Sequence, residues 1–229
     1  TGKTLAYSLP LLRNLIYSTQ ENPRVLILVP TRELVVQVVD SLNDLNVYTN
    51  NRILGVYGGT NINTQKQLVY NGLDILVGTP GRLIDLTLTG TLRLKEIKKL
   101  VIDEVDEMLN QGFLKPITHF FENLPEKRQN LMFSATLTED VETLIKSTFY
   151  NPIKIEIAPH GTPLEKINQK AYAVPNFNTK VNLLKHLLTR DESMSRVLVF
   201  VINNACPSFS AAAFKLLLAT TLLILSITT

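Results

Sequence analysis

Short runs of consecutive apolar residues recur along this chain, and the stretches between them carry apolar residues every three or four positions. The runs are rich in valine, isoleucine and leucine, which is typical of strands buried on both faces of a parallel sheet. This alternation predicts an α/β fold with a doubly wound, mostly parallel sheet. The predicted strands are residues 25–29, 53–57, 75–77, 100–102, 130–133 and 153–157. The predicted helices are residues 33–45, 64–70, 107–121 and 138–149.

A break in the pattern lies near residues 158–163, where two prolines and one glycine interrupt the chain. Such residues mark linkers because they disfavour a continuing helix or strand. Beyond the break, strands over residues 170–174 and 196–201 and a helix over residues 179–188 predict the start of a second, incomplete α/β unit. The predicted division is a first domain over residues 1–158, a linker over 159–168, the start of a second domain over 169–201 and an apolar tail over 202–229.

The tail is almost wholly apolar from Ala211 to Ile227, and Lys215 interrupts it. About a dozen apolar or threonine positions remain, which is short of the roughly 20 that a membrane span needs. We therefore expect a packed helix or an out-of-frame terminus here rather than a transmembrane helix, and no membrane partner.

Composition narrows the classes of protein to consider. With 45% hydrophobic and 19% charged residues, the chain can bury a core and is not a disordered polymer. The formal charge of +3 is mild, so any surface for nucleic acid has to be local. The single cysteine, Cys206, excludes an internal disulfide and fits a reducing compartment, so we expect a cytoplasmic protein. His119, His160 and His186 lack the spacing of a zinc site.

Several polar or small residues follow the predicted strands. Because the carboxyl ends of parallel strands meet at one edge of a sheet, we expect these residues to converge there and to form a site. They are Thr31, Gly58, Thr79, Asp103 and Ser134.

Asp103 and Glu104 come immediately behind the apolar run 100–102. A carboxylate in this place can hold Mg²⁺ through water, and its neighbour can orient and deprotonate an attacking water. The alternative is that both are simply acids favoured at the start of a helix. Gly2-Lys3-Thr4 matches the end of a phosphate-binding loop, in which glycine admits the phosphate, lysine reaches its oxygens and the hydroxyl binds magnesium. For so short a match taken alone, the alternative to a phosphate-binding loop is a frayed chain terminus.

Five motifs occur in the order and spacing of DEAD-box RNA helicases, which the chain resembles from Thr1 to Val201. The motifs are Pro30-Thr31-Arg32-Glu33-Leu34, Gly58-Gly59, Thr79-Pro80-Gly81-Arg82, Asp103-Glu104-Val105-Asp106 and Ser134-Ala135-Thr136. Val105 stands where the family has alanine in its acid box. All three acids are kept, so we expect the chemistry to tolerate the change, with overpacking as the risk. The resemblance implies a RecA-like fold.

The resemblance also implies ATP and Mg²⁺ as cofactors. The residues that it implies at the nucleotide are Thr1, Gly2, Lys3, Thr4, Asp103 and Glu104. Those that it implies in catalysis are Lys3, Asp103, Glu104, Asp106, Ser134 and Thr136. Thr4 and Asp103 would hold the metal ion. Asp106 would connect to the second domain's side of the cleft, while Ser134 and Thr136 would link the acid box to closure driven by RNA.

RNA is the partner that the resemblance implies, held through its sugar–phosphate backbone. Such contacts read no base, so binding is expected to tolerate any sequence and to weaken with salt. The alternative to an RNA contact is a plain turn at Gly58-Gly59 and at Pro80-Gly81. The residues implied at RNA are Thr31, Arg32, Gly58, Gly59, Thr79, Gly81 and Arg82.

The function expected from this resemblance is that of an ATP-dependent RNA helicase, in which RNA-stimulated ATP hydrolysis is coupled to local duplex unwinding. Because the chain begins inside the phosphate loop and carries no recognisable arginine finger downstream, we expect this piece to bind nucleotide poorly and not to unwind. One alternative is a non-catalytic fragment that binds the RNA backbone through Arg32 and Arg82. Another is an ATP-driven DNA helicase, against which the motifs at Thr31 and Thr79 argue by resemblance.

Overall fold

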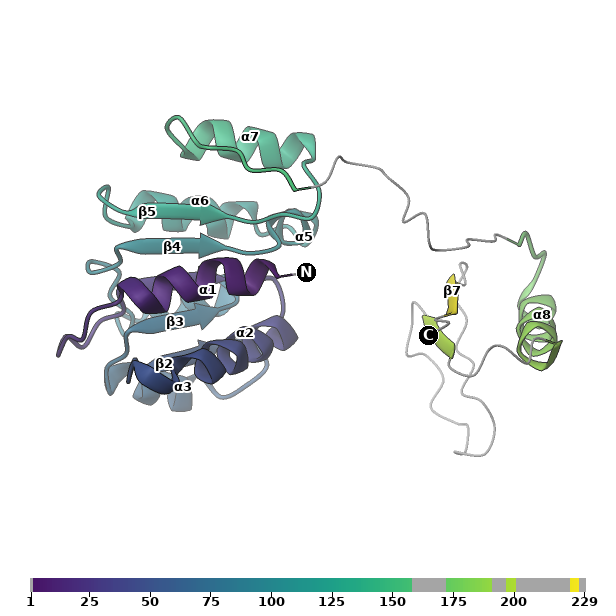
Figure 1. The fold of residues 1–229 in the computed structure, drawn as a ribbon, viewed down its shortest axis with the longest axis horizontal. Helices are drawn as coiled ribbons and strands as arrows, with labels where there is room; N and C mark the ends of the chain where they lie inside the picture. The colour runs from purple at the N-terminus through teal and green to yellow at the C-terminus, as the bar shows by residue number, and fades with distance from the viewer. Residues whose placement is uncertain (1, 158–171, 191–196, 201–222, 227–229) are drawn as a thin grey trace. The chain divides into compact units, whose positions relative to one another are not determined.

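The computed structural model describes residues 2–157, 172–190, 197–200 and 223–226. The chain divides into two compact units, Thr1–His160 and Gly161–Thr229. We describe each unit by itself (Figure 1). The finer division into four segments stays a prediction, and the predicted linker at residues 159–168 lies outside the described residues.

The first unit is built on a five-stranded sheet in the order β2-β3-β1-β4-β5, and every neighbouring pair is parallel. The fold class predicted from the apolar runs is therefore confirmed. The strands are β1 (Val25–Leu28), β2 (Ile53–Val56), β3 (Ile75–Gly78), β4 (Lys99–Ile102) and β5 (Gln129–Met132).

Helices cover both faces of this sheet (Figure 1). The helices of the first unit are α1 (Lys3–Asn14), α2 (Arg32–Leu45), α3 (Ile62–Tyr70), α4 (Pro80–Leu88), α5 (Val105–Asn110), α6 (Leu114–Asn123) and α7 (Glu139–Thr148), and a short 3-10 turn, η1 (Asn46–Tyr48), follows α2. On one face Val25 and Ile27 of β1 pack with α1 and α2. On the other face Leu26 and Leu28 of β1 pack in the cluster that includes residues of α3 to α7. Because alternate residues of one strand point to opposite faces, a strand buried on both faces needs an unbroken apolar run.

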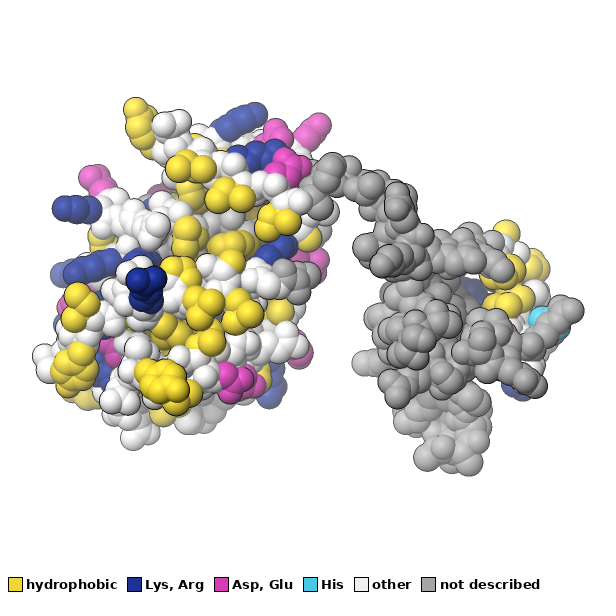
Figure 2. Space-filling model, viewed as in Figure 1, with side chains coloured by type: hydrophobic (Ala, Val, Ile, Leu, Met, Phe, Trp, Pro, Cys, Tyr) yellow, Lys and Arg dark blue, Asp and Glu magenta, His cyan; other side chains and the backbone are white. Residues whose placement is uncertain are grey.

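The face covered by α1 and α2 presents apolar side chains to solvent (Figure 2). Leu5 and Leu9 on α1 and Val36 on α2 are each roughly half exposed. Basic side chains do not gather over these two helices in that view.

Two predicted elements differ from the structure. Residues 153–157 form no strand, and Ile153, Ile155 and Ile157 are 84–96% exposed. A strand requires a hydrogen-bonding neighbour, and β5 is the last strand on its side of the described sheet. The predicted helix over residues 107–121 is two helices, because Gly112 adopts a left-handed φ of 80° and its N–H bonds to the Leu109 carbonyl. This arrangement ends α5 before α6 begins.

Two helices were not predicted. Pro80-Gly81 is a turn signal in the sequence, yet Pro80 occupies the first position of α4 behind Thr79 as the N-cap. Proline suits that position because its missing N–H has no partner in the first turn of any helix. Helix α1, which begins at Lys3, was also missed, although its apolar residues Tyr7, Leu11 and Leu12 have helical spacing.

The second unit contains α8 (Phe177–Arg190) and the antiparallel pair β6 (Val197–Phe200) and β7 (Leu223–Ser226). The predicted helix over residues 179–188 and the predicted strand over 196–201 are confirmed where they are described. The strand expected over 170–174 is wrong at residues 172–174, which form neither helix nor strand. The packed helix expected in the tail is wrong for residues 223–226, which pair as a strand because β6 offers them a partner. In the described part of the chain, no helix has the length and apolar character to cross a membrane.

Candidate nucleotide and RNA site

The predicted site residues follow strands whose last residues lie side by side at one edge of the sheet. Parallel pairing aligns the final residues of all five strands, which are Val56, Gly78, Leu28, Ile102 and Met132 in sheet order. The residues that follow each strand therefore emerge at the same edge, as the sequence predicted. This edge carries the acid box beside α1 and the glycine-rich turns farther along.

Asp103 follows β4 directly and is 7% exposed. The Tyr7 hydroxyl donates a hydrogen bond of 3.0 Å to its Oδ2, and the Glu104 backbone N–H donates one of 3.0 Å to its Oδ1. Burial raises the pKa of the Asp103 carboxyl above its ordinary value, although these two bonds and the charge of Lys3 oppose the shift. The carboxylate is thus held in place by two donors, and no ion pair to it is formed among the described residues, which suits an incoming metal ion.

Tyr7 belongs to none of the motifs that predict the site. It is completely buried on α1, and its ring lies 5.2 Å from that of Phe133. Burial and the neighbouring Asp103 carboxylate raise the pKa of the Tyr7 phenol far above its usual range, so the hydroxyl remains a donor. No local pattern could reveal this contact, since 96 residues separate the two partners.

Glu104 has a left-handed backbone, with φ 53° and ψ 50°, at the N-cap of α5. Residues other than glycine adopt this conformation at a cost of about 1–3 kcal/mol, and such strain concentrates at functional positions. Burial and the adjacent Asp103 charge raise the pKa of the Glu104 carboxyl. Val105, which replaces the family's alanine, is fully buried in the core behind the acids.

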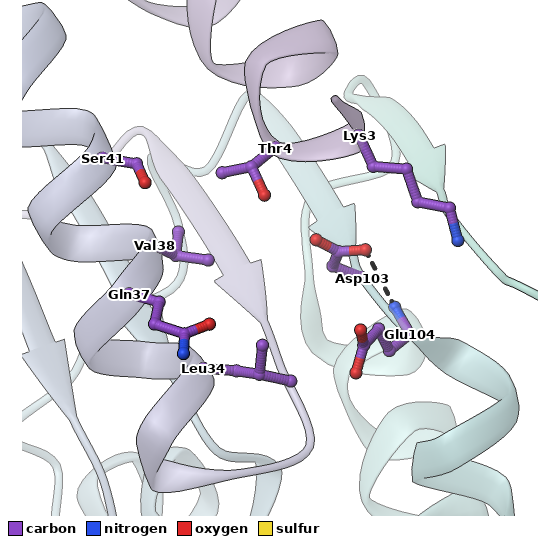
Figure 3. Close-up of a pocket in the computed structure, with 8 residues that line it drawn as sticks. All are labelled: Lys3, Thr4, Leu34, Gln37, Val38, Ser41, Asp103 and Glu104. Atoms are coloured by element: carbon purple, nitrogen blue, oxygen red, sulfur yellow. Dashed lines mark hydrogen bonds between the residues drawn. The ribbon is translucent and has the colours of Figure 1, made fainter. Parts of the chain in front are cut away.

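A pocket of about 130 Å³ joins the two halves of the predicted nucleotide site. Lys3 and Thr4 from the start of α1 line it together with Asp103 and Glu104. In Figure 3 the Thr4 hydroxyl and the two carboxylates face the same space, and the Lys3 side chain runs past the acid pair. The remaining lining residues, which the sequence did not indicate, are Leu34, Gln37, Val38 and Ser41 of α2.

The start of α1 suits a phosphate. Gly2 has φ 76° at the N-cap, a conformation that favours glycine, and the first free N–H groups of the helix follow it. These groups and the helix dipole favour an anion at this end. The positive charge of Lys3 lowers the pKa of Asp103 and of Glu104 against the effect of burial, which places the ammonium near both acids. Thr1, also predicted here, lies outside the described residues.

The donor set fits Mg²⁺, which prefers carboxylate, hydroxyl and water oxygens. Asp103 and Thr4 supply such oxygens to one pocket. Among the described residues there is no cluster of three or more histidine, cysteine or acidic side chains that could hold a metal alone. A magnesium ion here would therefore depend on water and phosphate oxygens for its other ligands, as this ion commonly does.

Asp106 connects the acid box to the segment after β5. The Thr136 hydroxyl and backbone N–H donate hydrogen bonds of 2.7 and 2.9 Å to its Oδ2, and the Ser134 hydroxyl donates one of 2.6 Å to the Thr136 carbonyl. Burial pushes the Asp106 pKa upward, but hydrogen bonds, led by that from the Thr136 hydroxyl, outweigh it and lower the pKa. The structure thus brings together three residues that the resemblance placed in one functional link.

Most of the residues predicted at RNA are exposed or half-exposed along the same edge. Thr31 caps α2 by accepting a hydrogen bond from the Leu34 N–H, and the exposed Arg32 stacks 4.8 Å from the Tyr57 ring. Gly59 has φ 79°. Gly58, Gly59 and Gly81 are exposed, and a Cβ at any of them would meet nothing within 4 Å, so their backbone is open to a ligand. Thr79 precedes α4 and is half-buried.

Arg82 is placed differently from the other predicted RNA residues. It is 9% exposed, and its guanidinium donates to the Gln65 side chain and to the Thr60 carbonyl at 2.8 and 2.9 Å. Both terminal nitrogens of the guanidinium are therefore bonded to the protein.

Comparison with known proteins agrees with this geometry. The family model described as DEAD/DEAH box helicase matches residues 1–144. The chain belongs to the DEAD/DEAH box helicase family. Its box reads Asp-Glu-Val-Asp at positions 103–106, and the edge that carries it is the one that the sheet topology predicts.

Relatives of this DEAD-box chain are considerably longer. The ATP-dependent RNA helicase RhlB of Pseudomonas syringae is 39% identical over 209 residues, which span 87% of this chain and 52% of that protein. The ATP-dependent RNA helicase DeaD of Buchnera aphidicola is 36% identical over 213 residues, which span 93% of this chain and 35% of that protein. The chain thus spans about a third to a half of the length of these curated relatives.

A solved DEAD box protein from the hyperthermophile Methanococcus jannaschii has the same fold. It superposes with a TM-score of 0.62 at 36% identity, covering 66% of this chain and 41% of that one. A hypothetical ATP-dependent RNA helicase from Sulfolobus tokodaii gives a TM-score of 0.59 at 34% identity. The RecA-like architecture implied by the sequence resemblance is confirmed.

Proposed function

We propose that this chain is the nucleotide-binding part of an ATP-dependent RNA helicase, in which RNA-stimulated ATP hydrolysis is coupled to local unwinding of a duplex. The observation that carries the proposal is the single pocket lined by Lys3, Thr4, Asp103 and Glu104. A phosphate-binding cation, a metal-binding hydroxyl and two acids are the parts that nucleotide hydrolysis requires. The names of RhlB and DeaD, both ATP-dependent RNA helicases, support the same assignment.

Each residue in the pocket has a distinct task in this proposal. Lys3 and the free N–H groups of α1 would bind the phosphates, and Thr4 and Asp103 would hold Mg²⁺. Bound Mg²⁺ would neutralise the charge that develops on the phosphate oxygens. Glu104 orients the attacking water and accepts its proton. A carboxyl whose pKa is raised is a better base than an ordinary one, because proton transfer to it is less unfavourable.

The acid box of the pocket is connected to the segment after β5 through Asp106, Ser134 and Thr136. Their hydrogen bonds join the start of α5 to the segment between β5 and α7. A shift of the acid box on nucleotide binding would therefore move that segment. We propose that this connection couples ATP binding to closure on RNA.

RNA binding is proposed for the edge beside β1, β2 and β3. Arg32 offers charge, Thr31 and Thr79 offer hydroxyls, and the open backbone at Gly58, Gly59 and Gly81 admits a phosphate. Contacts of this kind predict binding that tolerates any sequence and weakens steeply with salt. The single cysteine of the chain further suits the reducing, cytoplasmic compartment in which such a protein would meet RNA.

We further propose that this chain hydrolyses ATP weakly. Its pocket of about 130 Å³ is smaller than the roughly 300–1,000 Å³ of typical small-molecule sites. The alternative function, a non-catalytic module that binds the RNA backbone, is favoured by the exposed Arg32 and the open glycines.

Phosphate release, measured with and without RNA, separates these possibilities when combined with a salt titration of RNA binding. Slow release that Glu104→Gln abolishes supports the impaired helicase, because that change removes only the base. RNA binding without any release supports the non-catalytic module. RNA-stimulated turnover near that of a full-length relative contradicts the impairment, and absence of both nucleotide and RNA binding contradicts the proposed function.

A further inference from the structure

The Arg82 guanidinium donates hydrogen bonds to the side chain of Gln65 and the backbone of Thr60. Arg82 stands in the first turn of α4 and is 9% exposed. One terminal nitrogen, Nη1, donates 2.8 Å to the Gln65 side-chain oxygen, and the other, Nη2, donates 2.9 Å to the Thr60 carbonyl. Its nearest acid, Asp85, is 3.9 Å from Nε and largely exposed. The arginine is therefore anchored by neutral oxygens from a different part of the chain.

Gln65 completes the connection from α3. It is 7% exposed, and its amide donates 2.8 Å to the Thr60 hydroxyl and 3.2 Å to the Tyr57 carbonyl. The Thr60 hydroxyl also donates 3.2 Å to that carbonyl. Gln65 thus accepts from Arg82 on one side and donates to both ends of the turn on the other.

The turn held in this way contains Gly58 and Gly59. Both glycines are exposed, and Gly59 needs its positive φ of 79°. A turn with such open backbone gains little order from packing, since a Cβ at either glycine would meet nothing within 4 Å. Its conformation depends on the hydrogen bonds that close its ends at Tyr57 and Thr60.

We infer that Arg82 and Gln65 are positioning residues, which hold the Gly58-Gly59 turn in the shape that accepts an RNA phosphate, and that Arg82 makes no RNA contact of its own. This inference rests on the proposed RNA-binding function. It differs from the sequence-based assignment of Arg82 as a direct phosphate ligand. Arg32, which is exposed at the same edge, supplies the direct contact.

The salt dependence of RNA affinity distinguishes the two assignments. An arginine that neutralises a phosphate contributes about one unit to the slope of log affinity against log salt, and its loss removes that unit. A positioning residue changes the affinity and leaves the slope as it was. Gln65 is buried and carries no charge, so its loss removes no phosphate charge contact and acts through the groups that it bonds.

The experiment measures fluorescence anisotropy of a short single-stranded RNA with the full chain across a series of salt concentrations. We expect Arg82→Lys and Gln65→Ala each to weaken binding about threefold to tenfold, as loss of one or two hydrogen bonds would, without a change of slope. Their double variant should be no weaker than the poorer single one, because both act through one network. Arg32→Ala is the matched control and should lower the slope by about one unit.

Arg82→Gln and Gln65→Glu make the test sharper. Arg82→Gln should weaken binding as Arg82→Lys does, again with the slope kept. If Arg82 instead contacts phosphate, Arg82→Gln lowers the slope by about one unit while Arg82→Lys retains it, and the inference is overturned. Gln65→Glu keeps the acceptor for Arg82 but cannot donate to Tyr57 and Thr60, so it should reproduce Gln65→Ala.

Hydrogen exchange of residues 57–60 gives a readout that does not involve RNA. We expect Gln65→Glu to accelerate it severalfold, with urea unfolding confirming that each variant is folded. Unchanged exchange in both Gln65 variants would overturn the positioning inference. If the unaltered chain binds no RNA while exchange responds as expected, the proposed function fails but the structural connection stands.

Discussion

Two buried aspartates at opposite edges of one sheet behave in opposite ways. Asp74 lies just before β3, and Asp103 lies just after β4; they are 4% and 7% exposed. Asp74 is paired with Arg24 and Arg52 at 3.0 and 3.1 Å and accepts a further hydrogen bond from Gln20. Burial alone would raise its pKa, but the bonds from Arg52, Arg24 and Gln20 lower it. At Asp103 burial prevails and the pKa is raised.

This contrast separates two edges of the sheet. At the stabilising edge, before the strands, Asp74 is paired within the fold, and at the working edge, after the strands, Asp103 lines the candidate site. Asp74 ties the starts of β1, β2 and β3 together, since Arg24 and Arg52 directly precede β1 and β2. Within the described part of the chain Asp103 has no such ion pair, and it lines a pocket. An acid satisfied by the fold contributes stability, whereas one left incompletely satisfied is available to a ligand.

Removing Asp74 should have the largest effect. Asp74→Ala leaves two arginines without their shared partner, so we expect the free energy of unfolding to fall by about 3–5 kcal/mol. Urea denaturation measures this. Asp103→Asn is the control, because it removes a desolvated acid and keeps its size, and we expect it to cost less than about 1 kcal/mol. Equal losses in the two variants would refute the distinction between the edges.

The pH dependence of stability should differ in sign at the two edges. The folded-state pKa of Asp74 lies below its ordinary value, so its contribution is present above about pH 4 and is lost as the pH falls through the folded pKa. The folded-state pKa of Asp103 is raised, so its contribution is present in acid and is lost as the pH rises through that pKa. Each unit of pKa displacement corresponds to about 1.4 kcal/mol.

Thermal unfolding measured between acid and neutral pH tests whether the two aspartates change the stability in opposite directions as the pH rises. Asp74→Asn should flatten the loss of stability on acidification. Asp103→Asn should instead make the protein relatively more stable at neutral pH than in acid, compared with the unaltered chain. A variant pair with parallel profiles would argue against opposite pKa shifts.

Tyr7→Phe should have a smaller effect on stability. It removes only the hydroxyl that donates to Asp103 and keeps the packed ring, so we expect a loss of about 1–2 kcal/mol in urea denaturation. Because Asp103 then loses one of its two donors, magnesium-dependent nucleotide binding should weaken as well. Tyr17→Phe, at an exposed tyrosine, is the matched control and should leave both quantities unchanged.

Thr136→Val should have the smallest effect. The hydroxyl bond to Asp106 is exposed, and the Thr136 backbone donor remains, so we expect a loss of about 0.5 kcal/mol. The Asp106 pKa should move upward toward its ordinary value, because one of the bonds that lower it is gone. Carboxyl chemical shifts followed through a pH titration report this change, and an unmoved pKa would exclude the hydroxyl as its cause.

Much of the working edge could be predicted without coordinates. Apolar runs without alternation indicated strands buried on both faces, and one motif after each strand indicated a shared edge. These signals are local, so they are visible in the chain itself. The positions of Asp103, Thr31 and Thr79 followed from them.

Tertiary neighbours decided the rest. Tyr7 reaches Asp103 across 96 positions, and Arg82, predicted to contact RNA, is buried against Gln65. Residues 153–157 have a strand-like pattern but pair with no strand of the described sheet. Residue types and their periodicity therefore determined the class of fold and the location of the site. Burial and hydrogen-bond partners decided which side chains are free to act, because both depend on groups that are distant in sequence and adjacent only after folding.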